Sequence, residues 1–351
     1  MKSWFDYFKY ILSGLFLVCM ACSCSRNEDL KYNGETATLS LNIPMLNTSS
    51  RADISGTTEE DAIHHLRVVI LSQGAKESIN KVFTKTELET GGGKVTIDNV
   101  PVGEVQMYVI ANEAALGKDY SDLTTLRDDA ITVQNKRKVL VNDYERMHFP
   151  KRGSEFANEN NSATPKGLPM SWMSQFKVSV PDGQPQSVNV ELQRCVAKLN
   201  IIMQSTLSEE IVIKEMNFGA FFGDRLYLFQ EKELNLDVPD EAQYAAKTYG
   251  DVHNPLDIRI PANGEETLVC YIYPSFAWKD QDKTSPYTIG FVSDKTTYEP
   301  KYFVHDYQVL NSIARNTQVN ITAKLSKPAN IDITFNVVPW DPQTVDVPSF
   351  D

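Results

Sequence analysis

The 351-residue chain has few of the features that mark enzymes or nucleic-acid binders. It contains no nucleotide-binding glycine loop, no nucleophile elbow and no HExxH zinc motif. With 34 basic and 46 acidic residues its formal charge is −12, and the absence of a basic stripe argues against a nucleic-acid partner. Hydrophobic residues still make up 42% of the chain, which is typical of folded domains. We therefore expect a globular protein that is not an enzyme and needs no cofactor.

Metal ligands and cysteines are also scarce. Of the five histidines, His64 and His65 are adjacent and point to opposite faces of a strand, so we expect no metal site. Three of the five cysteines fall within the first 24 residues, which leaves Cys195 and Cys270 in the body. Both lie in apolar, strand-like runs and are expected to be buried as small hydrophobic residues. A disulfide between them remains an alternative.

One apolar run, residues 11–21, follows two lysines near the start of the chain. A membrane-spanning helix needs about 20 apolar residues, so this run is too short for one and is typical of a signal peptide. The cysteines that follow resemble a bacterial lipoprotein signal, in which the thiol after a small residue is acylated. We predict residues 1–23 as a lipoprotein signal peptide and Cys24 as the anchor, with Cys22 as the alternative. An ordinary secretory signal is a further alternative.

The body of the chain reads as a succession of β-strands. In the first, Ala37, Leu39, Leu41, Ile43 and Met45 fall on one face and polar residues on the other. Further strand-like runs, separated by turn formers, are Leu66–Leu71, Lys94–Val100, Gln106–Ala111, Phe176–Val180, Val188–Leu192, Leu199–Met203, Ile211–Ile213, Leu226–Phe229, Leu256–Ile260, Thr267–Tyr273, Tyr287–Val292, Val319–Leu325 and Ile331–Val338. This spacing predicts an all-β chain of antiparallel sandwiches. Helical signal is limited to Ser121–Asp129 and Asp240–Lys247.

Turn formers at residues 181–185 indicate a domain boundary near the middle of the chain. We predict a propeptide with the first strand at 24–51, an N-terminal sandwich at 52–183 and a C-terminal sandwich at 184–351. The polar stretch 151–166 is predicted to be an exposed loop.

Several strings resemble the Bacteroidales fimbrillin (FimA-type) pilus subunits. They follow the lipoprotein leader in order along nearly the whole mature chain: Asn47–Asp53, Asn99–Gly103, Tyr108–Glu113, Gly167–Ser171, Leu192–Leu199 and Ala314–Thr317. The resemblance implies two tandem transthyretin-like β-sandwich domains and export as a lipoprotein to the cell outer membrane. It also implies that an arginine-specific protease removes the first strand, which here places the cut between Arg51 and Ala52. The resemblance thus implies a structural or adhesive subunit of a surface fimbrium, which would polymerise with other fimbrial subunits by strand exchange.

The physics of such an exchange is visible in the residues themselves. A cut after Arg51 frees the strand that carries Leu39, Leu41, Ile43 and Met45, which exposes a sheet edge and apolar pockets. A donor strand from a second subunit would fill them by β-augmentation, and because this contact does not close, it builds a fibre. The C-terminus offers two candidate donors, which carry Ile331, Ile333, Phe335 and Val337 in one case and Val345 and Val347 in the other. The alternative is that both are ordinary last strands.

A second function of another class is a monomeric surface lipoprotein that binds glycans through exposed aromatic residues. Its candidate residues are Trp172, Trp278 and the stretch Tyr271–Pro274. A hydrolase ranks third and would need two carboxylates facing each other in a cleft. The sequence leaves open whether a fimbrial subunit of this kind forms the stalk, the tip or the anchor.

Overall fold

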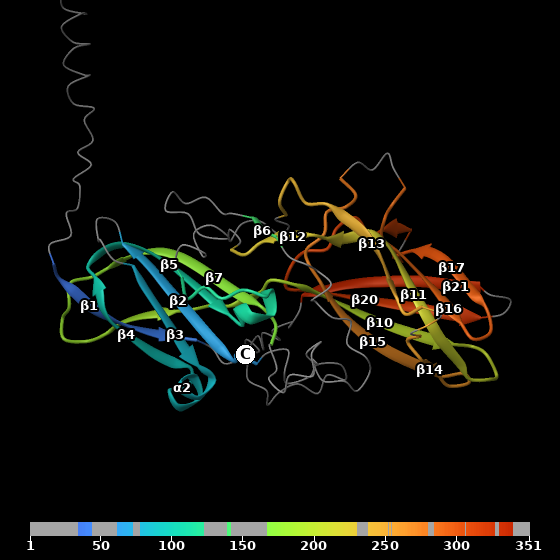
Figure 1. Ribbon diagram of the computed structural model, residues 1–351, viewed down its shortest axis with the longest axis horizontal. Helices are drawn as coiled ribbons and strands as arrows, with labels where there is room; N and C mark the ends of the chain where they lie inside the picture. The colour runs from blue at the N-terminus through green and yellow to red at the C-terminus, as the bar shows by residue number, and fades with distance from the viewer. Residues whose placement is uncertain are drawn as a thin grey trace, which may run out of the picture.

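The computed structural model describes residues 34–43, 62–72, 78–122, 139–141, 167–229, 238–251, 253, 255–279, 284–305, 307–326 and 330–339. Strands dominate these residues, with one short α-helix, α2 (Lys85–Thr90), and one 3-10 helix, η1 (Glu113–Leu116). No helix in this part of the chain is long and apolar enough to cross a membrane. The strands form two sandwiches that lie end to end along the long axis of Figure 1.

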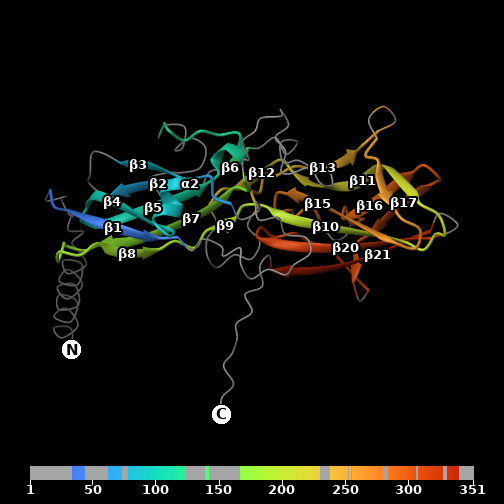
Figure 2. The same ribbon diagram turned by 90° about the horizontal axis from the view of Figure 1, so that it is seen from below.

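The first sandwich stacks a sheet of three strands on a sheet of five. In spatial order the small sheet contains β4 (Lys94–Pro101), β1 (Thr36–Asn42) and β8 (Gln186–Asn189), which lie side by side in Figure 2. The larger sheet contains β3 (Ile79–Thr84), β2 (His65–Ser72), β5 (Gly103–Ala111), β7 (Met170–Val178) and β9 (Gln193–Arg194). Because strands alternate with a period of two, every second side chain of each sheet points inward, and these side chains form one buried cluster.

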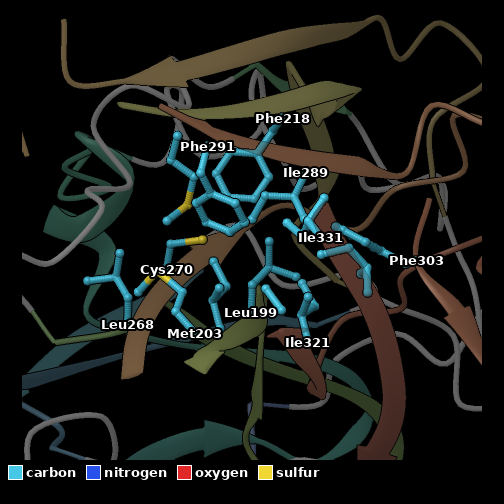
Figure 3. Packing of buried hydrophobic residues seen from close by; sticks show 14 of the residues in the cluster. Leu199, Met203, Phe218, Leu268, Cys270, Ile289, Phe291, Phe303, Ile321 and Ile331 are labelled. Atoms are coloured by element: carbon cyan, nitrogen blue, oxygen red, sulfur yellow. The ribbon is translucent and has the colours of Figure 1, made fainter. Parts of the chain in front are cut away.

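The second sandwich is built in the same way from more strands. In spatial order, one sheet contains β15 (Glu265–Ile272), β10 (Ala197–Ser205), β20 (Thr317–Ser326), β21 (Asn330–Pro339), β18 (Val304–His305) and β19 (Gln308–Val309). The other orders β13 (Tyr244–Tyr249), β11 (Ile211–Gly223), β16 (Thr288–Ser293) and β17 (Thr297–Tyr302), with β14 (Ile258–Ile260) also on β11. Figure 3 shows the side chains that meet between them: Leu199, Ile321 and Ile331 come from the first sheet, and Phe218, Ile289 and Phe291 come from the second.

The all-β fold class is therefore confirmed, with a detail that the sequence did not reveal. Most strand pairs are antiparallel, but among the described strands β1 pairs with β8, β10 with β20 and β18 with β21 in parallel. Parallel neighbours need a crossover connection, so their pairing joins strands that are far apart in the sequence. For β1 and β8 that separation spans almost the whole first sandwich.

A third buried cluster joins the two sandwiches. It combines Tyr108 and Leu116 of the first with Val196, Phe229 and Tyr273 of the second half of the chain. The rings of Tyr108 and Phe229 lie 4.9 Å apart, centroid to centroid. A small sheet of β6 (Val139–Val141) and β12 (Arg225–Tyr227) lies at the same junction in Figure 1. The domains therefore meet through a packed apolar interface.

Arg315 lies in this junction, 7% exposed, and binds the linker between the sandwiches. Its guanidinium donates to the carbonyl oxygens of Arg194 (3.0 Å), Gln193 (3.0 Å) and Leu228 (3.1 Å) and to Ser171 Oγ (2.9 Å). A buried cation is costly unless its donors are satisfied, and here four acceptors from three segments surround it. The arrangement ties β7, the linker and the start of β20 together.

The structure corrects the predicted domain boundary. Residues after 183 were assigned to the second domain, yet β8 pairs with β1 and β9 pairs with β7, both within the first sandwich. The turn at residues 181–185 joins β7 to β8 and lies inside the first sandwich. The described chain passes to the second sandwich between β9 and β10, after Arg194.

The predicted helices and the predicted loop can also be compared with the structure. The helical prediction for Asp240–Lys247 is wrong, because this segment enters β13, which pairs with β11. The other helical prediction, Ser121–Asp129, and the predicted loop at 151–166 lie largely or wholly outside the described residues.

Cys195 and Cys270 are both free and buried, as expected, and they belong to different clusters, which excludes the disulfide. Burial raises the pKa of the Cys270 thiol.

Candidate functional site

The first strand, β1, lies in the centre of its sheet. It pairs antiparallel with β4 on one side and parallel with β8 on the other. Backbone bonds extend the pairing at its far end, where Ile43 N donates to Gly93 O (2.7 Å) and Val190 N donates to Asn42 O (2.9 Å). The sequence predicted that loss of this strand would expose one sheet edge. Because β1 has neighbours on both sides, its loss would open a slot between two strands instead.

The floor of this slot is the core of the first sandwich. Ala37, Leu39, Leu41 and Ile43 are buried, and the three large side chains are at most 1% exposed. They belong to the same buried cluster as residues of β4 and of the facing sheet. The outward residues between them are half-buried, so the predicted alternation of the strand is confirmed. Full burial of a large aliphatic side chain contributes about 1.5–3 kcal/mol, so these three together contribute about 5–9 kcal/mol.

The outer edges of the small sheet are tied to the larger sheet by side chains. Lys81 Nζ of β3 donates to Thr96 O of β4 (3.0 Å). On the other side, Gln186 of β8 donates to Lys177 O (3.1 Å) and accepts from Ser179 N (2.9 Å), at the end of β7. Both walls of the slot are therefore held to the facing sheet by bonds that do not involve β1.

Two polar contacts mark the outward face of β1. Thr38 Oγ1 donates to Asp98 Oδ1 of β4 at 2.9 Å, and Asn42 Nδ2 donates to Asn189 Oδ1 of β8 at 3.2 Å. They lie four residues apart, on opposite walls, on the same face of the strand. Sequence analysis did not single out Asp98. The one available signal is the run Ile97-Asp98-Asn99-Val100, in which two polar residues separate two apolar ones and break the period of two.

The first candidate donor, residues 330–339, forms β21 and is hydrogen-bonded to β20 along its whole length. Ile331 and Ile333 are buried in the core of the second sandwich, Phe335 is half-buried against it and Val337 is 40% exposed. In this structure β21 is thus an ordinary strand of its own domain. The inward side chains of its first half are buried in that domain's core. The second candidate, with Val345 and Val347, lies outside the described residues.

The predicted processing residues cannot be placed in the fold. Cys24, its alternative Cys22, Arg51, Ala52 and Met45 all lie outside the described residues. The described chain ends at Ile43, directly after β1, and resumes at Ala62, before β2. The predicted cut therefore falls in the connection between β1 and the rest of the first sandwich.

The aromatic residues considered for glycan binding are mostly buried. Tyr271 and Tyr273 are buried at the junction between the sandwiches, so their predicted exposure is wrong. Trp172 and Trp278 are half-buried and pack against the first and second cores. Their rings contribute to packing, and none of these four side chains forms an exposed platform.

The titratable side chains of the described residues include a buried network in the first sandwich. No group of three His, Cys, Asp or Glu side chains is placed to hold a metal ion in that part of the molecule. The buried Arg67 guanidinium binds both oxygens of Glu113 (2.8 and 2.6 Å) and Asn80 Oδ1 (2.8 Å). His65 Nε2 accepts from the Glu113 backbone N–H (3.1 Å), and burial lowers the pKa of His65. This network ties β2 and β3 to η1.

Comparison with known proteins gives the family. Residues 33–346 match the family model described as Fimbrillin-A associated anchor proteins Mfa1 and Mfa2. The chain belongs to this family. The resemblance to fimbrillins found in the sequence is thereby confirmed, and the match begins just before β1 and extends beyond β21. No curated protein sequence matches the chain.

Solved structures similar to this fimbrillin-family chain include two from Porphyromonas gingivalis. The tip fimbrial protein Mfa3 is 16% identical, with a TM-score of 0.48 over 87% of this chain and 99% of that one. A fimbrilin is 14% identical, with a TM-score of 0.46 over 87% and 98%. A putative cell adhesion protein from Parabacteroides distasonis is 13% identical, with a TM-score of 0.48 over 88% and 98%.

Proposed function

We propose that the protein is a structural subunit of a cell-surface fimbrium that polymerises when a strand from another subunit replaces β1. The observation that carries this proposal is the position of β1, which fills a slot between β4 and β8 with three fully buried side chains. Other fimbrial subunits are the partners, and the protein needs neither a cofactor nor a reaction of its own. Family membership supports the fimbrial role.

In the proposed pathway the precursor is exported as a lipoprotein, anchored through Cys24 to the outer membrane. An arginine-specific protease then cuts between Arg51 and Ala52 and detaches β1 from the chain. The three buried side chains contribute about 5–9 kcal/mol, which is comparable to the whole stability of a typical domain. The cut fragment therefore stays in the slot until a strand that binds as well replaces it.

The donor proposed here comes from the C-terminal end of another subunit. Release of β21 would break its pairing with β20, which extends over ten residues. It would also expose Ile331 and Ile333, which are only 4% exposed in the folded domain. The stretch with Val345 and Val347 follows β21 in the sequence, and its use as a donor would leave the pairing of β20 with β21 in place. We therefore assign the donor to residues 340–351. A subunit that gives one strand and receives another makes a head-to-tail contact, which propagates into a fibre.

The experiment is a truncation after Pro339, which removes residues 340–351 and keeps β21. We expect the truncated protein to be secreted with an unchanged melting temperature and to form no multimers after arginine-specific cleavage. A substitution of Val337, which is exposed on β21, to Ala is the control and should leave multimers intact. Multimers of normal length from the truncated protein would contradict the assignment of the donor.

A further inference from the structure

The strand β4 carries a bulge opposite β1. The register of the pair shifts between Ala37 and Leu39, so that two residues of β4, Asp98 and Asn99, lie opposite the single residue Thr38. Asn99 has a φ of +61°, the left-handed conformation that asparagine adopts more readily than most residues. The extra residue lets Ile97 and Val100 both face the core, and it leaves Asp98 and Asn99 exposed on the outer face.

The bulge brings a carboxylate to one defined point of the slot. Asp98 Oδ1 accepts a hydrogen bond from Thr38 Oγ1 at 2.9 Å. Directly before Thr38, the inward position is occupied by the small residue Ala37, whereas the next three inward positions hold Leu39, Leu41 and Ile43. One end of the slot therefore differs from the rest in two ways. Its inward site, occupied by Ala37, is small, and a hydrogen-bond acceptor, Asp98 Oδ1, lies on its outward face.

The alternation of apolar and polar residues does not by itself determine the register of a strand in the slot. A strand that slips by one residue turns its apolar side chains outward, which the buried floor rejects. A slip by two residues keeps the apolar side chains inward, so the floor alone distinguishes it poorly. In β1 itself such a slip would bring Thr36 or Ser40, which also carry hydroxyl groups, opposite Asp98 and would move Glu35 or Leu39 onto the small site of Ala37. The small site therefore opposes the slip, whereas Asp98 requires only that a hydrogen-bond donor lie opposite it.

Building on the proposed function, we propose that Asp98 selects, among strands that enter the slot, those that carry a hydrogen-bond donor at the position of Thr38. At the other end, Asn189 of β8 accepts from Asn42 at 3.2 Å, which adds a second polar contact four residues further on. A strand that runs in the direction of β1 therefore meets the carboxylate of Asp98 first, then the apolar sites of Leu39 and Leu41, and then the side-chain amide of Asn189.

Both C-terminal segments of the chain can meet this requirement. In the direction of β1, Thr344 opposite Asp98 puts Val345 and Val347 at the sites of Leu39 and Leu41. Likewise, Asn330 opposite Asp98 puts Ile331 and Ile333 at those two sites. Asp98 therefore does not by itself choose between the two segments.

The test measures how well the slot discriminates between strands. The full chain is cleaved after Arg51, and a labelled peptide of residues 35–43 competes at equilibrium with the retained fragment. The peptide is used with Thr38 or with Thr38→Val, and the protein is used as wild type or as Asp98→Ala. A hydrogen bond to a charged group is worth about 1–1.5 kcal/mol at such a site, so we expect the wild type to prefer the threonine peptide about five- to tenfold. Asp98→Ala should bind both peptides equally.

The outcomes distinguish the inference from the function on which it rests. Glu89→Ala, an exposed acid on α2 of the same sandwich, is the control and should discriminate like the wild type. If Asp98→Ala keeps the full preference for threonine, or if the wild type has none, Asp98 does not select a hydrogen-bond donor at this position, although strand exchange still stands. If no peptide enters any of these proteins, strand exchange itself is contradicted, and the role of Asp98 falls with it.

Discussion

Replacement of Leu41 by alanine should weaken the precursor and leave the assembled polymer unchanged. Leu41 lies near the C-terminal end of β1, is completely buried and belongs to the core of the first sandwich. A buried Leu→Ala substitution costs about 2–5 kcal/mol, because the transfer free energy of the side chain is lost and a cavity remains. In the proposed fibre β1 has left the subunit, so the same substitution has nothing to destabilise there.

Two measurements on the Leu41→Ala variant compare its effect on the precursor with its effect on the fibre. Chemical denaturation of the uncleaved Leu41→Ala chain should show an unfolding free energy lower by about 2–5 kcal/mol. After arginine-specific cleavage, the weakened fragment should leave sooner, so that multimers form faster than from the wild type while their heat stability is unchanged. The matched control is Ser40→Ala, which alters the neighbouring half-buried, outward position and should change either quantity little.

Either of two results would contradict this prediction. An unfolding free energy within about 0.5 kcal/mol of the wild type would mean that Leu41 does not pack as the structure shows. Multimers that are themselves less heat-stable in proportion to the loss in the precursor would mean that β1 remains in the fibre.

Three further predictions concern the rest of the molecule. Arg315→Ala should raise amide hydrogen exchange in the linker at residues 193–196 at least tenfold, because the buried carbonyls lose their donor; unchanged protection would contradict the role of Arg315 at the junction. Burial lowers the folded-state pKa of His64 and His65, so the unfolded chain binds more protons and stability should fall as the pH drops below about 6.5. Thermal unfolding between pH 7.5 and 5.5 measures this fall, which the double variant His64→Gln/His65→Gln should reduce; an equal fall in both proteins would refute it. Cys195 and Cys270 should resist thiol reagents in the native protein and react after denaturation, and rapid native labelling would show that the cores are open.

The first strand shows what the sequence reveals well. Its alternation over Ala37–Ile43 is strict, and the burial pattern of β1 follows it residue by residue. Alternation identifies the inward face, but it does not identify the neighbours of a strand. The parallel pairing of β1 with β8 joins segments about 147 residues apart, as the bond from Asn42 to Asn189 illustrates, and nothing local encodes it.

The errors have the same physical origin. The turn at residues 181–185 resembles a domain boundary because turn formers end one strand pattern and begin another, yet β8 returns to the first sandwich. The strand β13 (Tyr244–Tyr249) contains two alanines and a lysine, which favour a helix locally, but pairing with β11 outweighs that preference. The bulge at Asp98 and Asn99 breaks the alternation by one residue, and only the register against β1 shows why.

The central claim is that β1 is a removable strand whose slot another subunit fills. The most direct test is the N-terminal sequence of the subunit isolated from purified surface fibres. If β1 is removed before assembly, the subunit in the fibre starts at Ala52 and lacks residues 1–51, including β1. A fibre subunit that starts at an acylated Cys24, with β1 still attached, would contradict it.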